Sequence, residues 1–203
     1  MIGRDGYMIP KKIHYCWFGK GKKSKLALKC IRSWRQYCPE YEVIEWNEEN
    51  FDIDMNGYTR MCYAEKKYAY LSDYVRLWVV EKYGGIYFDT DVEVIRSLEE
   101  LLRNDAFFCF ENKQYVASGL GFGSVAHGKV IQAMLKEYEI LLDGKNGVRM
   151  CPKLNTQALV ALGLKQNGRK QNVCEAVIYP MDVLNPYNSA TGKLEKTENT
   201  FSI

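Results

Sequence analysis

The sequence predicts an α/β fold in which helices cover both faces of a mostly parallel central sheet. Two observations lead to this prediction. Helical and extended patterns alternate along the chain, and elements that alternate in this way form parallel sheets between helical layers. The chain has 203 residues and is 47% hydrophobic, which suits one globular domain, residues 1–203, with a sizeable core.

The first elements are predicted to form a β-α-β unit. A β-rich run covers residues 13–18, and Ser24 can then cap a helix that continues to about Tyr37 and is stopped by Pro39. The next extended run is Glu42–Trp46. A helix between two such runs places the two strands side by side and parallel.

The strongest helix prediction covers residues 68–83, where Leu71, Val75 and Val79 belong to an apolar stripe. Gly84 and Gly85 follow as a C-terminal stop. The acidic strand that comes next is predicted to continue to residue 93.

The second half of the chain is predicted to contain shorter elements. Helices are expected at residues 98–102, 129–142 and 155–162, extended segments at 106–111, 115–123 and 177–179, and a polar tail from Asn185. The glycines of residues 118–123 alternate with other residues, but no strand-turn-helix context surrounds them. We interpret them as closely approached backbone rather than as a phosphate-binding loop.

Composition limits the partners and the compartment. The formal net charge of +3 is too small to indicate a nucleic-acid partner. We interpret the lysine-rich residues 20–25 as a solvated loop, with a phosphate or membrane-surface patch as the alternative.

Seven cysteines without a C-x-x-C pair indicate reduced core thiols. The absence of a signal peptide or a spanning apolar run predicts a cytoplasmic protein and leaves peripheral attachment to the inner membrane face open.

The apolar residues 86–88 lead to Asp89, Asp91 and Glu93. On a continuous strand these three carboxylates would share one face. Ligands gather at the carboxyl ends of parallel strands, and carboxylates that lie together need a compensating charge. Hard divalent cations bind to one or two carboxylates together with substrate phosphates. The pattern therefore predicts a cation site.

Four blocks of residues carry a resemblance to a known family. They are Ile-Pro-Lys-Lys-Ile-His-Tyr-Cys-Trp-Phe-Gly at 9–19, Ser-Trp at 33–34 with Pro-Glu-Tyr-Glu at 39–42, Ala-Tyr-Leu-Ser-Asp-Tyr-Val-Arg at 69–76, and residues 83–93. In this order and spacing they resemble the DXD-motif, family-32-like glycosyltransferases. That family includes capsular polysaccharide enzymes, yeast-type mannosyltransferases and clostridial toxin glucosyltransferase domains.

The resemblance implies a GT-A type, Rossmann-like three-layer sandwich. It also implies retaining transfer of a sugar from a UDP- or GDP-sugar to a saccharide or lipid-linked saccharide acceptor in surface polysaccharide or glycan synthesis, with Mn²⁺ or Mg²⁺ as cofactor. By resemblance, Asp91 is the first metal ligand and Asp89 contacts both donor and metal. Asp73 and Arg76 bind sugar hydroxyls and diphosphate, and Trp17 flanks the nucleobase. The implied catalytic residues are Asp89, Asp91 and Arg76.

Each of these roles has a plainer alternative. Asp73 and Arg76 are spaced i, i+3 on a helix and could simply pair with each other. Trp17 and Tyr87 could be core aromatics, although Tyr87 is also a donor-contact candidate by resemblance. His14 is interpreted as a satisfied strand histidine, and His127 as a surface residue.

No residue is an evident nucleophile, so same-face attack is favoured over a covalent intermediate. Cys151 stands where the family carries a glycine before proline, so contacts of Asn155 or Gln157 with the donor are not carried over. Members of the family usually continue into a histidine- and tryptophan-containing closing segment, and we expect this chain to lack it. The alternatives are a non-catalytic or truncated sugar-nucleotide-binding module and, with less support, a D-x-D phosphatase.

Overall fold

The computed structural model describes residues 8–188 and 191–203. Within these residues a seven-stranded sheet has the order β2-β1-β3-β5-β4-β7-β6, and β8 pairs with β9. The strands are β1 Lys12–Cys16, β2 Glu42–Trp46, β3 Gly85–Tyr87, β4 Ala106–Cys109, β5 Phe122–Ser124, β6 Gln171–Val173, β7 Ala176–Tyr179, β8 Tyr187–Asn188 and β9 Lys193–Leu194. Strands β5 and β6 run antiparallel to their neighbours, and the other strands of the large sheet run parallel to one another.

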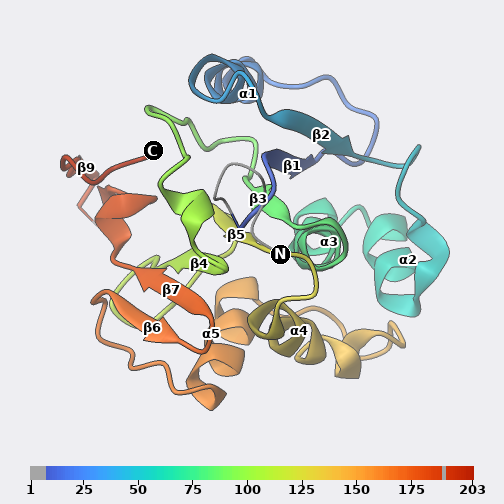
Figure 1. The fold of residues 1–203 in the computed structure, drawn as a ribbon. Helices are drawn as coiled ribbons and strands as arrows, with labels where there is room; N and C mark the ends of the chain where they lie inside the picture. The colour runs from blue at the N-terminus through green and yellow to red at the C-terminus, as the bar shows by residue number, and fades with distance from the viewer. Residues whose placement is uncertain (1–7, 189–190) are drawn as a thin grey trace.

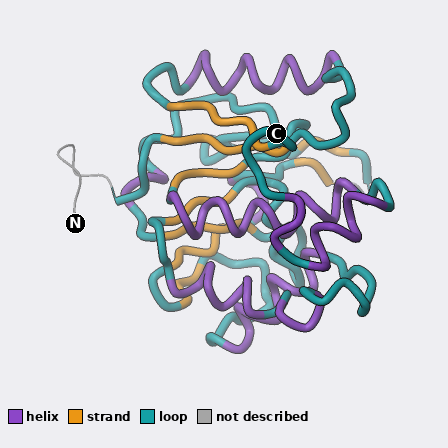
Figure 2. The backbone as a smooth tube through the Cα atoms, turned by 90° about the vertical axis from the view of Figure 1, so that its right-hand side faces the viewer, coloured by secondary structure: helices purple, strands orange, loops and turns teal. Residues whose placement is uncertain are grey.

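Helices cover both faces of this sheet (Figure 1). They are α1 Lys25–Tyr37, α2 Gly57–Ala64, α3 Tyr68–Tyr83, α4 Lys129–Lys136 and α5 Cys151–Ala161, with short 3₁₀ turns at Ile53–Met55, Leu101–Arg103, Glu139–Leu141 and Met181–Val183. Helix α1 contributes to one hydrophobic cluster and α2 to α5 contribute to the other. The fold is therefore the predicted three-layer α/β sandwich, and Figure 2 shows the strands stacked between the helices.

The two clusters follow from the alternation of strand side chains. In β4, Ala106 and Phe108 belong to the cluster under α3 to α5, whereas Phe107 and Cys109 belong to the cluster under α1. All four residues are fully buried. A strand that is apolar on both faces is typical of a sheet that is covered on both sides.

Several predicted elements are confirmed closely. Ser24 caps α1, because its side chain accepts a hydrogen bond of 3.0 Å from the amide of Ala27. Strand β2 and helix α3 have the predicted bounds. Helix α5 begins at Cys151 rather than at residue 155, since Pro152 occupies its first turn, where a missing N–H costs nothing.

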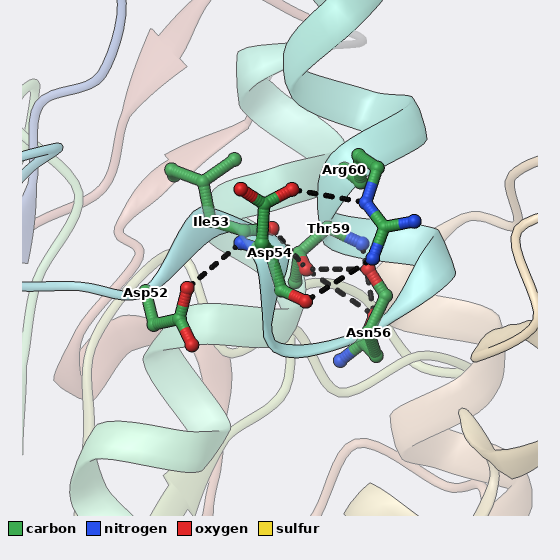
Figure 3. A network of polar contacts seen from close by, with 6 residues as sticks. All are labelled: Asp52, Ile53, Asp54, Asn56, Thr59 and Arg60. Atoms are coloured by element: carbon green, nitrogen blue, oxygen red, sulfur yellow. Dashed lines mark hydrogen bonds and ion pairs between the residues drawn. The ribbon is translucent and has the colours of Figure 1, made fainter.

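The connection from β2 to α3 is held by a polar network around the N-terminus of α2 (Figure 3). The Asn56 side chain accepts a hydrogen bond of 2.9 Å from the amide of Thr59, and the Thr59 hydroxyl donates to the carbonyl of Ile53 at 2.8 Å. Arg60 pairs with Asp54 at 2.9 Å. This network stabilises the start of α2. Helix α3, which follows α2, contains Asp73 and Arg76.

The prediction of a strand through residue 93 is wrong. Strand β3 ends at Tyr87, and the amide of Val92 donates to the carbonyl of Asp89 at 3.1 Å, which closes a turn over residues 89–92. Glu93 then pairs through its backbone with Ile203, with both hydrogen bonds at 2.8 Å. Because the chain turns, Asp89, Asp91 and Glu93 do not share one strand face.

Other features follow the composition. All seven cysteines are free thiols, and six of them are buried. Across the part of the chain that the structure describes, every helix is too short or too polar to cross a bilayer.

Candidate active site

Two adjoining pockets open at the carboxyl ends of β1 and β3. One has a volume of about 310 Å³ and the other of about 420 Å³. Ala69, Arg76, Asp89 and Asp91 line both pockets. The chain order reverses between β1 and β3, since β2 lies on one side of β1 and β3 on the other. Ligands bind at such a switch point in open α/β sheets.

A guanidinium at the centre of the site joins two carboxylates. Arg76 is buried, and its Nη2 lies 2.8 Å from Asp73 Oδ1 and 3.1 Å from Asp89 Oδ1. The hydroxyl of Tyr87 donates to the same Asp89 oxygen at 3.0 Å. Asp73 and Arg76 do pair, as the plainer interpretation expected. However, the guanidinium also ties α3 to the end of β3, so the pair is part of a larger cluster.

Burial shifts the acidity of this cluster. It raises the pKa of Asp73 to about 6, although Arg76 opposes the rise. Burial also raises the pKa of Asp89, with Arg76 opposing and Asp91 adding to the increase. Burial lowers the pKa of Arg76, but Asp89 and Asp73 outweigh that effect and keep the guanidinium charged. One cation is thus shared between two partly desolvated acids.

Gly119 lets Asp89 and Arg76 come close to the loop before β5. A Cβ atom at Gly119 would lie 2.8 Å from Arg76 Nη1 and closer still to Asp89 Oδ2. The amide of Asp89 donates to the carbonyl of Gly119 at 3.1 Å. The interpretation of the glycine-rich run as closely approached backbone is confirmed here, although Gly119 lies in a turn rather than in a strand.

Trp17 lines the smaller pocket. Its indole Nε1 donates to the carbonyl of Gly21 at 2.7 Å, and the amine of Lys23 lies 5.6 Å from the centre of its ring. Tyr68 lines the same pocket and packs against Gly19, where a side chain could not fit. The indole is partly exposed and therefore offers an aromatic surface to a flat ligand.

The other residues considered from the sequence lie around this centre. Tyr87 is buried and reaches the site through its hydrogen bond to Asp89. Glu93 pairs with Lys29 at 2.5 Å. His14 is a satisfied strand histidine, as predicted: it accepts from the indole of Trp46 at 3.0 Å and its Nε2 lies 2.9 Å from the carbonyl of Gly84. His127 is also on the surface as predicted, with 68% of its side chain exposed.

The oxygens of this site suit a hard divalent cation only in part. Asp91 is exposed and forms no ion pair with a described residue, and Asp89 Oδ2 makes no hydrogen bond to one. Within residues 8–188 and 191–203 no group of three or more His, Cys, Asp or Glu side chains could hold a metal. The two carboxylates fit Mn²⁺ or Mg²⁺ only together with oxygens from a diphosphate and water, as is usual for these ions.

Among the lining residues that were not assigned to the site from the sequence are Glu111 and Cys151. Glu111 lines the larger pocket, and burial raises its pKa. Cys151 lines it as well, and its thiol lies 3.1 Å from the hydroxyl of Ser118. Burial raises the pKa of Cys151 to about 11, so the thiol stays protonated near neutral pH. The signal for Cys151 in the sequence was its place before Pro152, where the resembling family carries a glycine.

Fold and site together define a class. The mixed sheet between helical layers, with D-x-D directly after β3, has the GT-A type architecture. The PaToxG glycosyltransferase is similar in structure with a TM-score of 0.60 and 18% identity over 75% of this chain and 69% of that chain. The UDP-bound glycosyltransferase domain from the YGT toxin is similar with a TM-score of 0.52 and 12% identity over 79% of this chain and 69% of that chain.

Sequence comparison supports the same conclusion. Residues 24–108 match the family described as glycosyltransferase sugar-binding region containing DXD motif. The inositol phosphoceramide mannosyltransferase 3 of Schizosaccharomyces pombe is 32% identical over 106 residues, which are 49% of this chain and 29% of that protein. The resemblance to DXD-motif glycosyltransferases is therefore confirmed, and the chain spans less than a third of this curated relative.

Proposed function

We propose that this protein is a retaining glycosyltransferase that moves a sugar from a nucleotide-diphosphate sugar to a saccharide or lipid-linked saccharide acceptor with the help of a divalent cation. The similar proteins are named as glycosyltransferases, which supports a sugar donor for this chain but does not identify it. One solved structure holds UDP, and the curated relative is a mannosyltransferase. UDP- and GDP-sugars are therefore the first donors to test.

The charge of the pockets carries the proposal. Among the described residues that line them, Arg76 is the only cation, whereas Asp73, Asp89, Asp91 and Glu111 are acids. A nucleoside diphosphate is itself an anion and would be repelled by this surplus of carboxylates. Asp89 and Asp91 would hold a divalent cation, which would offset this repulsion and would supply Lewis-acid assistance to the leaving group.

In this proposal each residue of the pockets has a separate role. Trp17 offers its ring to the nucleobase, and Arg76 keeps Asp73 and Asp89 in place through its two ion pairs. Asp73, which is largely ionised at pH 7, accepts hydrogen bonds from sugar hydroxyls. The larger pocket, which holds Glu111, takes the acceptor.

Transfer follows same-face attack in this proposal. The acceptor oxygen forms its bond to the anomeric carbon as the bond from that carbon to the phosphate oxygen breaks, and the bonding pair leaves with the diphosphate. The acceptor proton passes to a phosphate oxygen. This route needs no enzyme nucleophile, in keeping with the pairing of Asp73 and Asp89 to Arg76.

A screen of UDP- and GDP-sugars for hydrolysis with and without Mn²⁺ tests the proposal. A transferase releases free sugar slowly from one donor and only with the metal, and NMR of the first product shows retention at the anomeric carbon. Metal-dependent binding without turnover for every donor would favour the alternative, a non-catalytic sugar-nucleotide-binding module. We propose a cytoplasmic location for the reaction, which fractionation of cells would test.

A further inference from the structure

The segment from Lys20 to Tyr37 concentrates positive charge. It contains seven of the 28 lysine and arginine residues of the chain and no aspartate or glutamate. Most of the segment is α1, which packs one side on the sheet and turns the other outward at the edge of the molecule (Figure 1). The loop at residues 20–25, interpreted from the sequence as solvated, is only the first part of this segment.

The outer side of α1 combines cations with apolar side chains. Lys25, Leu28, Arg32 and Arg35 follow one another at intervals of three or four residues, so they form one ridge. All four are exposed, and Leu28 has 44% of its surface accessible. Leu26 is exposed to 53% on the flank of this ridge. Two exposed leucines among cations are not needed for solubility or for the core.

Most of these charges have no internal partner. Lys23 pairs with Glu45 at 2.7 Å and Lys29 pairs with Glu93 at 2.5 Å. Lys25, Arg32 and Arg35 form no ion pair with any residue in the described ranges, and the same holds for Lys20 and Lys22 in the preceding loop.

We propose that the outer face of α1, together with residues 20–22, binds the surface of an anionic lipid bilayer. A helix of 13 residues is about 20 Å long and can lie flat on a membrane. A basic helix that also carries exposed leucines matches charged headgroups and the apolar layer beneath them. A nucleic acid would use the cations but would leave Leu26 and Leu28 without a contact.

Helix α1 packs beside the candidate active site. The indole of Trp34 in α1 donates to the carbonyl of Val92 at 2.8 Å, and Lys29 reaches Glu93, so the helix packs against the turn that carries Asp91. Binding through α1 therefore brings the pocket rim to within the width of one helix, ~10 Å, of the membrane. If the proposed function holds, this arrangement favours a lipid-linked acceptor at the bilayer surface.

Vesicle co-sedimentation tests the proposal on the whole chain. We compare vesicles of phosphatidylcholine alone with vesicles that also contain phosphatidylserine, at low and high salt. Replacing Lys25, Arg32 and Arg35 with glutamine should weaken partitioning onto the anionic vesicles by about 100-fold, since each cation near such a surface contributes about fivefold. Replacing Leu26 and Leu28 with serine should weaken it by about tenfold.

A control variant replaces Lys113, Lys165 and Arg169 with glutamine. These residues are exposed, lie near Gly168 and β6 at the opposite edge of the sheet from β2, and have no ion pair among the described residues. It changes the net charge by the same amount and should keep vesicle binding within about twofold.

Three results would overturn the proposal. The first is equal binding to both kinds of vesicle, and the second is a loss of vesicle binding in the control variant equal to that in the α1 variant. The third is an affinity for duplex RNA that equals the affinity for vesicles and is unchanged by the leucine replacements. Donor hydrolysis measured without vesicles keeps this test separate from the proposed function. It should be unchanged in the α1 variant, and its absence in the unaltered chain would count against the transferase instead.

Discussion

Replacement of Gly119 by alanine places a methyl group against the carboxylate of Asp89 and the guanidinium of Arg76. The new Cβ atom would lie 2.8 Å from Arg76 Nη1 and nearer to Asp89 Oδ2, whereas real Cβ atoms keep at least 3.0 Å. Both side chains must therefore withdraw, Arg76 by at least about 0.2 Å and Asp89 by more. Misplacement of a binding group on this scale lowers kcat/KM by about 10- to 100-fold.

The fold should tolerate the change, because the methyl group meets the ends of side chains rather than backbone. We expect the free energy of unfolding to fall by about 1–2 kcal/mol. The assay is metal-dependent hydrolysis of the donor found in the screen, with urea unfolding measured in parallel. Gly21→Ala is the matched control, since nothing lies within 4 Å of a Cβ atom at that position.

The reasoning would be refuted if Gly119→Ala hydrolysed the donor as fast as the unaltered protein. It would also be refuted if Gly21→Ala lost as much activity as Gly119→Ala. Loss of activity together with complete unfolding would mean that the steric estimate of stability is wrong.

Three further predictions concern single residues. Burial lowers the pKa of His14 to about 4, so the folded state resists protonation of this ring, and the contribution of His14 to the free energy of unfolding should fall by about 2 kcal/mol as the pH is lowered from 7 to 5. Urea unfolding of His14→Gln should lack this decrease, and an unchanged pH profile would contradict the assignment. Trp17→Ala should weaken binding of UDP or GDP in the presence of Mn²⁺ by about tenfold or more, and Trp17→Phe by less, whereas equal affinities by calorimetry would exclude stacking. Glu93→Gln removes a partly exposed ion pair with Lys29. The rate of donor hydrolysis should therefore stay within about twofold, and the free energy of unfolding within about 1 kcal/mol, of the values for the unaltered protein. A large loss of hydrolysis would show that Glu93 contacts the donor or its metal.

The elements with strong local signals were predictable. Ser24 before an amphipathic run, and the glycine pair after residue 83, identify the start of α1 and the end of α3. Gly84 and Gly85 have positive φ angles of 63° and 114°, which other residues rarely adopt. Local conformational preferences decide such boundaries, so they can be read from one sequence.

The turn after β3 was not predictable in this way. Its course depends on pairing of residues 93–95 with residues 201–203, about a hundred positions away in the chain. The approach of Gly119 to Asp89 likewise depends on the sheet order that brings β5 next to β3. The site residues Asp73, Arg76, Asp89 and Asp91 could be named from the resemblance, but their shared contacts come from the tertiary fold.

The central claim is that the acidic pocket binds a nucleoside diphosphate only through a divalent cation held by Asp89 and Asp91. Calorimetry of UDP and GDP binding, with and without Mn²⁺, tests it most directly, with Asp91→Asn as the variant. We expect binding of one nucleotide that requires Mn²⁺ and is at least about 100-fold weaker in Asp91→Asn. Equal affinity with and without the metal, or full metal-dependent affinity in the variant, would contradict the account.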